Sequence, residues 1–149
     1  MLTPSVDAIF HVRYAETDAM GVVHHASYIV WFEEGRSAYM RARGLPYSEV
    51  ERRGYYFAVV EVTARFLSPA RYDDRVVVRT RLAELHSRGL TFAYEIRRLA
   101  DDLLLVRGET RHICIDRAGK VQRIPADLLA VLEPVDRLAL VPDPPATSA

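Results

Sequence analysis

The chain has 149 residues, which fits one domain that buries about 68–70% of the surface of its unfolded chain. Hydrophobic residues make up 50% and charged residues 27%, and the 20 basic residues balance the 20 acidic ones, so there is no global attraction to nucleic acid or to an anionic membrane. The single cysteine, Cys114, cannot form an intrachain disulfide. No signal-like N-terminus and no run of about 18 apolar residues is found. We therefore expect a cytoplasmic domain without a membrane span.

The periodicity of apolar residues predicts one strand, one long helix and then mostly strands. Residues 8–14 alternate, with Phe10, Val12 and Tyr14 on one face, which predicts a half-buried strand. Residues 27–43 have helical spacing and are apolar over so much of the circumference that other elements are expected to wrap the helix. The further expected elements are a short helix at 48–53, strands at 56–67, 75–85, 90–96 and 103–116, and a short helix at 126–132.

These elements predict an α+β fold. Short turns between the later strands require antiparallel pairing, and a sheet of about five strands has one face that only the long helix can cover. We therefore expect an antiparallel sheet wrapped around helix 27–43, with edge strands that tend to pair with a second copy. Residues 1–141 are expected to form the single domain, and the Pro-rich residues 142–149 a disordered tail.

The loop between the first strand and the long helix concentrates polar chemistry. Residues 14–25 contain two carboxylates, two histidines, a tyrosine and a glycine. A strand–loop–helix entry lets a reactive side chain face the positive end of a helix. This loop is therefore the predicted active site.

A resemblance to a known family is carried by residues 11–28, HVRYAETDAMGVVHHASY. This segment is similar to the signature of the hotdog-fold acyl-CoA thioesterases, within them to the 4-hydroxybenzoyl-CoA thioesterase branch, which includes enzymes associated with the Tol–Pal system. It is a specific match. Looser matches follow at 31–33 with Arg36, at 68–74, at 92–95 and at 108–112, so that the resemblance covers most of residues 8–125.

The resemblance implies a fold, an activity and a set of roles. The fold is a long helix wrapped by an antiparallel sheet, and the activity is hydrolysis of acyl-CoA without metal or cofactor, in homodimers or homotetramers. Asp18 falls at the family's catalytic aspartate, and the oxyanion donor falls at the backbone amide of His25, whose side chain is also considered functional in the Tol–Pal members. Two departures are His24, where tyrosine is common, and Ser27, where asparagine is common.

The chemistry of Asp18 leaves alternatives open. A carboxylate with an ordinary pKa of about 3.9 is ionised at neutral pH, and it could attack the thioester carbonyl or deprotonate a water. It could also be only a turn aspartate that accepts backbone hydrogen bonds. Gly21, Val23 and Tyr14 are expected to shape the oxyanion and substrate positions, with Tyr14 in the core and its hydroxyl near the site.

Other polar residues rank lower. His24 and His25 with Glu16 or Asp18 suggest a metal only weakly, because no further ligand stands at a recognised spacing, so Glu16 and His24 are expected to support the site. Glu33 and Glu34 on the helix are expected to be solvated or paired, whereas Trp31, Phe32 and Tyr39 should pack in the core and Cys114 should be a small buried hydrophobe.

Arginines in or beside turns are candidates for the phosphates of CoA, because a guanidinium binds phosphate in a bidentate manner. Arg71, Arg88 and Arg123 have such positions, although a solvated surface role is the simpler alternative for each. Two further functions remain in view: a hotdog domain that binds acyl chains or a partner without turnover, and a hotdog dehydratase, for which a catalytic histidine in another setting would be expected.

Overall fold

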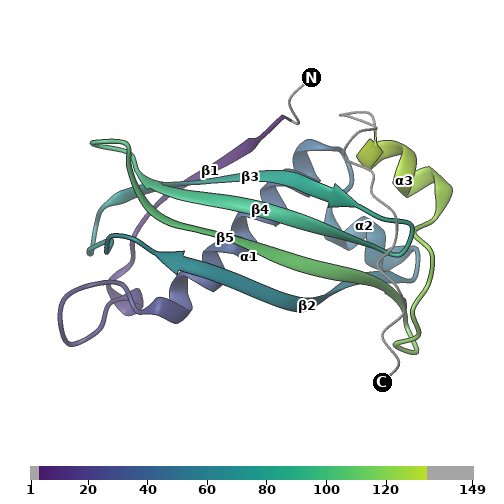
Figure 1. Ribbon diagram of the computed structural model, residues 1–149, viewed down its shortest axis with the longest axis horizontal. Helices are drawn as coiled ribbons and strands as arrows, with labels where there is room; N and C mark the ends of the chain where they lie inside the picture. Colours follow the sequence, from purple (N-terminus) through teal and green to yellow (C-terminus); the bar gives the residue numbers. More distant parts are fainter. Residues whose placement is uncertain (1–3, 134–149) are drawn as a thin grey trace.

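The computed structural model describes residues 4–133, and its five strands form one antiparallel sheet with α1 lying across one face (Figure 1). The strand order is β1-β3-β4-β5-β2. Within the described residues, no helix is long and apolar enough to cross a bilayer. The elements in chain order are β1 (Val6–His11), the 3-10 turn η1 (Tyr14–Glu16), α1 (His25–Ala42), α2 (Tyr47–Arg52), β2 (Tyr55–Phe66), β3 (Arg75–Leu85), β4 (Gly89–Arg98), β5 (Leu103–Asp116) and α3 (Ala126–Leu132).

The predicted order of elements is confirmed, and the differences in element bounds that bear on the site both concern the loop. The first strand ends at His11 rather than at residue 14, because the chain turns into η1. The long helix begins at His25, two residues earlier than predicted. The expected end of the domain at residue 141 and the segment 142–149 lie outside the described residues.

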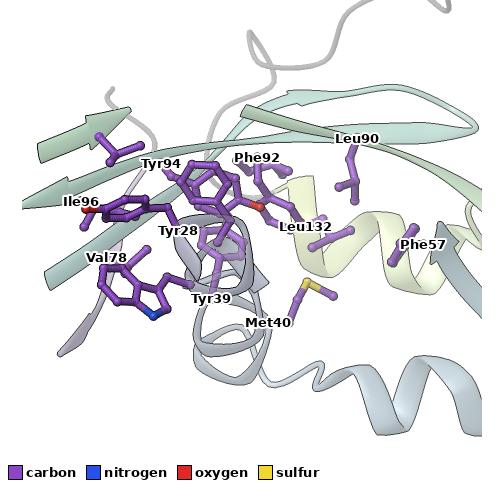
Figure 2. Close-up of a cluster of buried hydrophobic side chains, with 14 of the residues drawn as sticks. Tyr28, Tyr39, Met40, Phe57, Val78, Leu90, Phe92, Tyr94, Ile96 and Leu132 are labelled. Carbon is purple, nitrogen blue, oxygen red and sulfur yellow. The ribbon is translucent and has the colours of Figure 1, made fainter. Parts of the chain in front are cut away.

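The core lies between α1 and the inner face of the sheet (Figure 2). The inward-facing residues predicted for β4 are confirmed, since Phe92 and Tyr94 are buried against α1, although Thr91 and Ala93 between and beside them are buried as well. Phe32 stacks on Tyr94 with 4.4 Å between ring centroids, and Tyr39 meets Phe92 edge-on. Aromatic side chains of this size dominate the burial energy of a small domain.

Gly35 allows α1 to lie close to the sheet. A Cβ atom at this position would come within 2.4 Å of Thr80 Oγ1 and 2.7 Å of Val78 Cγ1 on β3. Glycine is thus the one residue that lets the helix backbone approach the strand at this point.

The predicted antiparallel sheet around the long helix is confirmed, and it covers one side of α1. Ile29 is 39% exposed and Val30 is 56% exposed, because they lie on the side of the helix turned away from the sheet. Strand β2 forms one edge of the sheet, and its exposed large hydrophobic residues are Tyr56, Val59, Val60, Val62 and Phe66.

Candidate active site

The loop that carries Asp18 is a small hairpin which delivers the chain directly to α1. Thr17 and Val23 form a β-bridge, and the Asp18 amide donates to the Val22 carbonyl at 2.8 Å. Gly21 lies at the tip with φ of 77°, a left-handed conformation that other residues adopt only with strain. The loop is therefore held by its own backbone.

The Asp18 carboxylate has one occupied oxygen and one open oxygen. Its Oδ1 accepts the Met20 amide at 2.8 Å and the Val22 amide at 3.5 Å. Within residues 4–133, no group donates a hydrogen bond to Oδ2. The turn role and a chemical role are thus compatible, because the turn uses only Oδ1.

The first turn of α1 leaves the amide of His25 available. His24 is the N-cap, and its Nδ1 accepts the Ala26 amide at 3.2 Å. The Ser27 amide donates to the His24 carbonyl at 2.9 Å. The His25 amide finds no acceptor in the part of the chain that the structure describes. An unpartnered N–H at the positive end of a helix suits a developing negative charge.

A hollow of about 320 Å³ is lined in part by His25. Tyr28 forms one wall and is fixed by its hydroxyl, which accepts the Ala70 amide at 3.0 Å. Phe66, at the end of β2, tilts against Tyr28 with 5.6 Å between ring centroids. The residues that line the hollow are Val23, His25, Tyr28, Phe66, Leu67, Ser68 and Pro69. Such largely apolar walls suit an acyl group.

The structure places only part of the predicted site in this hollow. Val23 and His25 line it, whereas Asp18, Gly21 and Tyr14 do not. The expected burial of Tyr14 is wrong: its side chain is 77% exposed and meets Tyr72 edge-on at 5.6 Å. The alternation that predicted its burial stops when the chain leaves β1 for η1.

The three candidate arginines lie at opposite ends of the sheet. Arg71 lies beside the loop, because it forms a β-bridge with Val22. Arg88 and Arg123 lie near the turn between β3 and β4, where the Ile124 amide donates to the Ser87 carbonyl. The 11 residues of β3 put about 35 Å between these ends, at about 3.3 Å per residue.

The lower-ranked carboxylates on α1 stay away from the hollow. Glu33 and Glu34 are exposed, and Glu34 pairs with Arg41 at 3.6 Å. Within residues 4–133, no group of three His, Cys, Asp or Glu side chains is placed to hold a metal ion. The rings of His24 and His25 instead stack on each other with 4.2 Å between centroids.

Glu16 is buried, a feature that its sequence position beside Asp18 did not predict. Only 8% of Glu16 is exposed, and its carboxylate accepts hydrogen bonds from the Arg13 amide and from Trp31 Nε1. Burial alone would raise the pKa of Glu16. The hydrogen bonds from Arg13 and Trp31 outweigh burial and hold that pKa below its usual value. Glu16 is therefore ionised in the folded protein.

A second buried polar side chain, that of His112, belongs to β5 and contacts Phe92 in the core. The ring of His112 is 2% exposed, and its Nδ1–H donates to the Phe57 carbonyl at 3.3 Å. Its Nε2 must then accept from the Thr110 hydroxyl at 2.8 Å, and Thr110 in turn accepts from the Tyr94 hydroxyl. Burial, and then the charge of Arg36, lowers the pKa of His112 to about 4.

Fold and site together define a class: a helix lying on an antiparallel five-stranded sheet, with a carboxylate loop at the start of the helix. The model of the thioesterase-like superfamily matches residues 12–132. The chain belongs to this superfamily and has its hotdog fold.

Related proteins agree with this assignment. The acyl-CoA thioester hydrolase YbgC of Escherichia coli is 30% identical over 120 residues, which are 80% of this chain and 89% of that protein. The crystal structure of the hypothetical protein TT1821 from Thermus thermophilus is 46% identical with a TM-score of 0.83, covering 87% of this chain and 98% of that one. A DHNA-CoA thioesterase from Staphylococcus aureus is 28% identical with a TM-score of 0.85, covering 90% of this chain and 92% of that one.

Proposed function

We propose that this protein hydrolyses an acyl-CoA thioester to a free acid and CoA, as a cytoplasmic member of the 4-hydroxybenzoyl-CoA thioesterase branch. The observation that carries the proposal is that one loop and the helix start that follows it hold two groups without a hydrogen-bond partner among the described residues. These groups are Asp18 Oδ2 and the His25 amide. A largely apolar hollow is lined in part by His25. The names of relatives such as YbgC support the activity.

Two routes use these groups. In the first, Asp18 Oδ2 attacks the thioester carbonyl, the C–S bond breaks, and CoA leaves as a thiolate that takes up a proton. Water then hydrolyses the resulting anhydride. In the second, Asp18 takes a proton from a water as that water attacks the carbonyl, and the proton passes to the departing sulfur. In both, the oxyanion accepts from the His25 amide, and one such donor is typically worth about 10²–10³ in rate.

A second copy is proposed to complete the site, as a homodimer or homotetramer. Asp18 does not line the hollow of its own chain, whereas Phe66, at the end of the edge strand β2, does. That edge is 12 residues long and carries exposed Val60 and Val62, and an exposed apolar edge favours pairing with another strand. Light scattering should give at least a dimer, and Val60→Lys should shift it toward the monomer. A wild-type monomer would contradict this.

The neighbouring copy also bears on the phosphates of CoA. Arg71 is the candidate from the same chain, because it lies beside the Asp18 loop. Arg88 and Arg123 lie at the far end of the sheet, so they would reach the same CoA only from another subunit.

The direct test is a panel of acyl-CoAs, from short aliphatic to aromatic acyl groups, with released CoA detected by a thiol reagent. Cys114 gives no background in this assay, because burial raises the pKa of its thiol to about 11. Release of CoA that scales with enzyme supports hydrolysis. Binding of acyl-CoA without release of CoA would instead favour an acyl-binding domain. In that case Asp18 would serve only to stabilise its turn.

A further inference from the structure

We propose that Glu16 is a positioning residue of the hydrolytic site, which sets the Asp18 loop against α1 through a hydrogen bond to Trp31. The inference rests on the proposed function. Trp31 Nε1 donates to Glu16 Oε2 at 2.5 Å, a short bond between a carboxylate at the start of the loop and the second turn of the helix. Charged hydrogen bonds of this kind are roughly twice as strong as neutral ones.

The carboxylate of Glu16 is fully engaged. Oε1 accepts the Arg13 amide at 2.8 Å, while Oε2 also accepts Arg13 Nη2 at 3.3 Å. Both carboxylate oxygens therefore accept hydrogen bonds from the protein. Because Glu16 is only 8% exposed, they have little contact with solvent. A buried charge with this many partners is costly to disturb.

Both ends of this connection are held by further contacts. Trp31 is 2% exposed and is held edge-on between Phe10 at 5.3 Å and Tyr28 at 5.0 Å. On the loop side, the Glu16 carbonyl accepts the His24 amide at 2.8 Å. One residue, Glu16, thus contacts the second turn of the helix with its side chain and the N-cap residue of the helix with its backbone.

The consequence concerns the two groups that do the chemistry. Asp18 is two residues after Glu16, and the His25 amide is one residue after His24. Fixing Glu16 therefore fixes the relation between the Asp18 carboxylate and the oxyanion donor. A misplacement of about 1 Å in such a pair can cost about 10²-fold in rate.

Two substitutions remove the connection from opposite sides. Glu16→Gln keeps the shape but replaces one acceptor by an NH₂ group, which must then face an N–H of Arg13 or Trp31. Trp31→Phe removes the indole N–H. Glu34→Gln is the matched control. It makes the same change to an exposed carboxylate on α1, the helix that carries Trp31.

We expect each of the two variants to lower kcat by about 10- to 100-fold with KM changed less than about twofold, while Glu34→Gln leaves both unchanged. The double variant should be no slower than the slower single variant, because both changes remove one bond. Additive losses, or a kcat at the control value, would overturn the proposal. Circular dichroism and thermal unfolding establish that each variant is folded.

Hydrogen exchange gives a readout that does not need turnover. The His24 and Met20 amides should exchange about tenfold faster in Glu16→Gln than in the wild type or in Glu34→Gln. Unchanged exchange would refute the positioning role. If the wild type releases no CoA from any substrate, the proposed function fails, and the exchange result still decides whether Glu16 holds the loop. A wild type that turns over beside unaffected Glu16 variants would refute only this inference.

Discussion

The buried ring of His112 predicts how stability depends on pH. In the folded protein its pKa is about 4, against an ordinary value of 6.5, because burial and then Arg36 disfavour the charged form. Its Nδ1–H already donates to Phe57 and its Nε2 accepts from Thr110, so a second ring proton would displace the Thr110 bond. Folding therefore favours the neutral ring.

This preference sets the sign and the size of the contribution that His112 makes to the free energy of unfolding. The folded pKa lies below the unfolded one, so the contribution of His112 is fully present above pH 6.5 and is lost as pH falls toward about 4. One pH unit corresponds to about 1.4 kcal/mol, so the whole gap is worth about 3 kcal/mol and the share already lost at about pH 5 is about 2 kcal/mol. This is a large fraction of the stability of a small domain.

Urea unfolding at about pH 7.5 and about pH 5, at one protein concentration, measures the loss. The free energy of unfolding of the wild type should fall by about 2 kcal/mol. His112→Asn should be less stable at neutral pH, since it loses the acceptor for Thr110, but its stability should be nearly flat over this interval. Equal losses in both proteins, or none in the wild type, would refute the reasoning.

Three further changes test the packing and the helix start. Gly35→Ala should lower the free energy of unfolding by about 1–3 kcal/mol, because its Cβ would press on Thr80; thermal unfolding measures it, and an unchanged midpoint would contradict the close approach. His24→Ala should cost about 1 kcal/mol by removing the cap on the Ala26 amide, whereas His24→Asn, which can cap, should cost less in the same denaturant titration; equal losses would exclude the capping role. Cys114 should stay unreactive to a thiol reagent until the protein unfolds, because burial raises its pKa to about 11; rapid labelling of the native protein would argue against that burial.

Much of the fold was predictable because periodicity reports burial. The alternation around Phe92 and Tyr94 predicted the inner face of β4, and the structure confirms it. Periodicity failed where apolar residues are exposed instead of buried. Ile29 and Val30 fit an apolar helix but lie exposed, since a single sequence does not distinguish a core face from a face left for another contact.

The site was less predictable because its parts depend on hydrogen-bond partners distant in sequence. The loop and Asp18 could be located from residue types, but the partner that buries Glu16 is Trp31, fifteen residues on. His24 was expected only to support the site, yet its Nδ1 is the N-cap acceptor; a histidine directly before a helical pattern was a weak signal for this. Tyr14 was misplaced because alternation was extended through a turn that no residue type marked.

The central claim is that Asp18 performs the chemistry, and Asp18→Asn tests it most directly. The amide oxygen of asparagine can still accept the Met20 amide, so the turn should survive while the open carboxylate oxygen is lost. With the best acyl-CoA of the panel, we expect kcat to fall by at least about 10²-fold in a variant with unchanged thermal unfolding. Wild-type hydrolysis by a folded Asp18→Asn protein would contradict the claim.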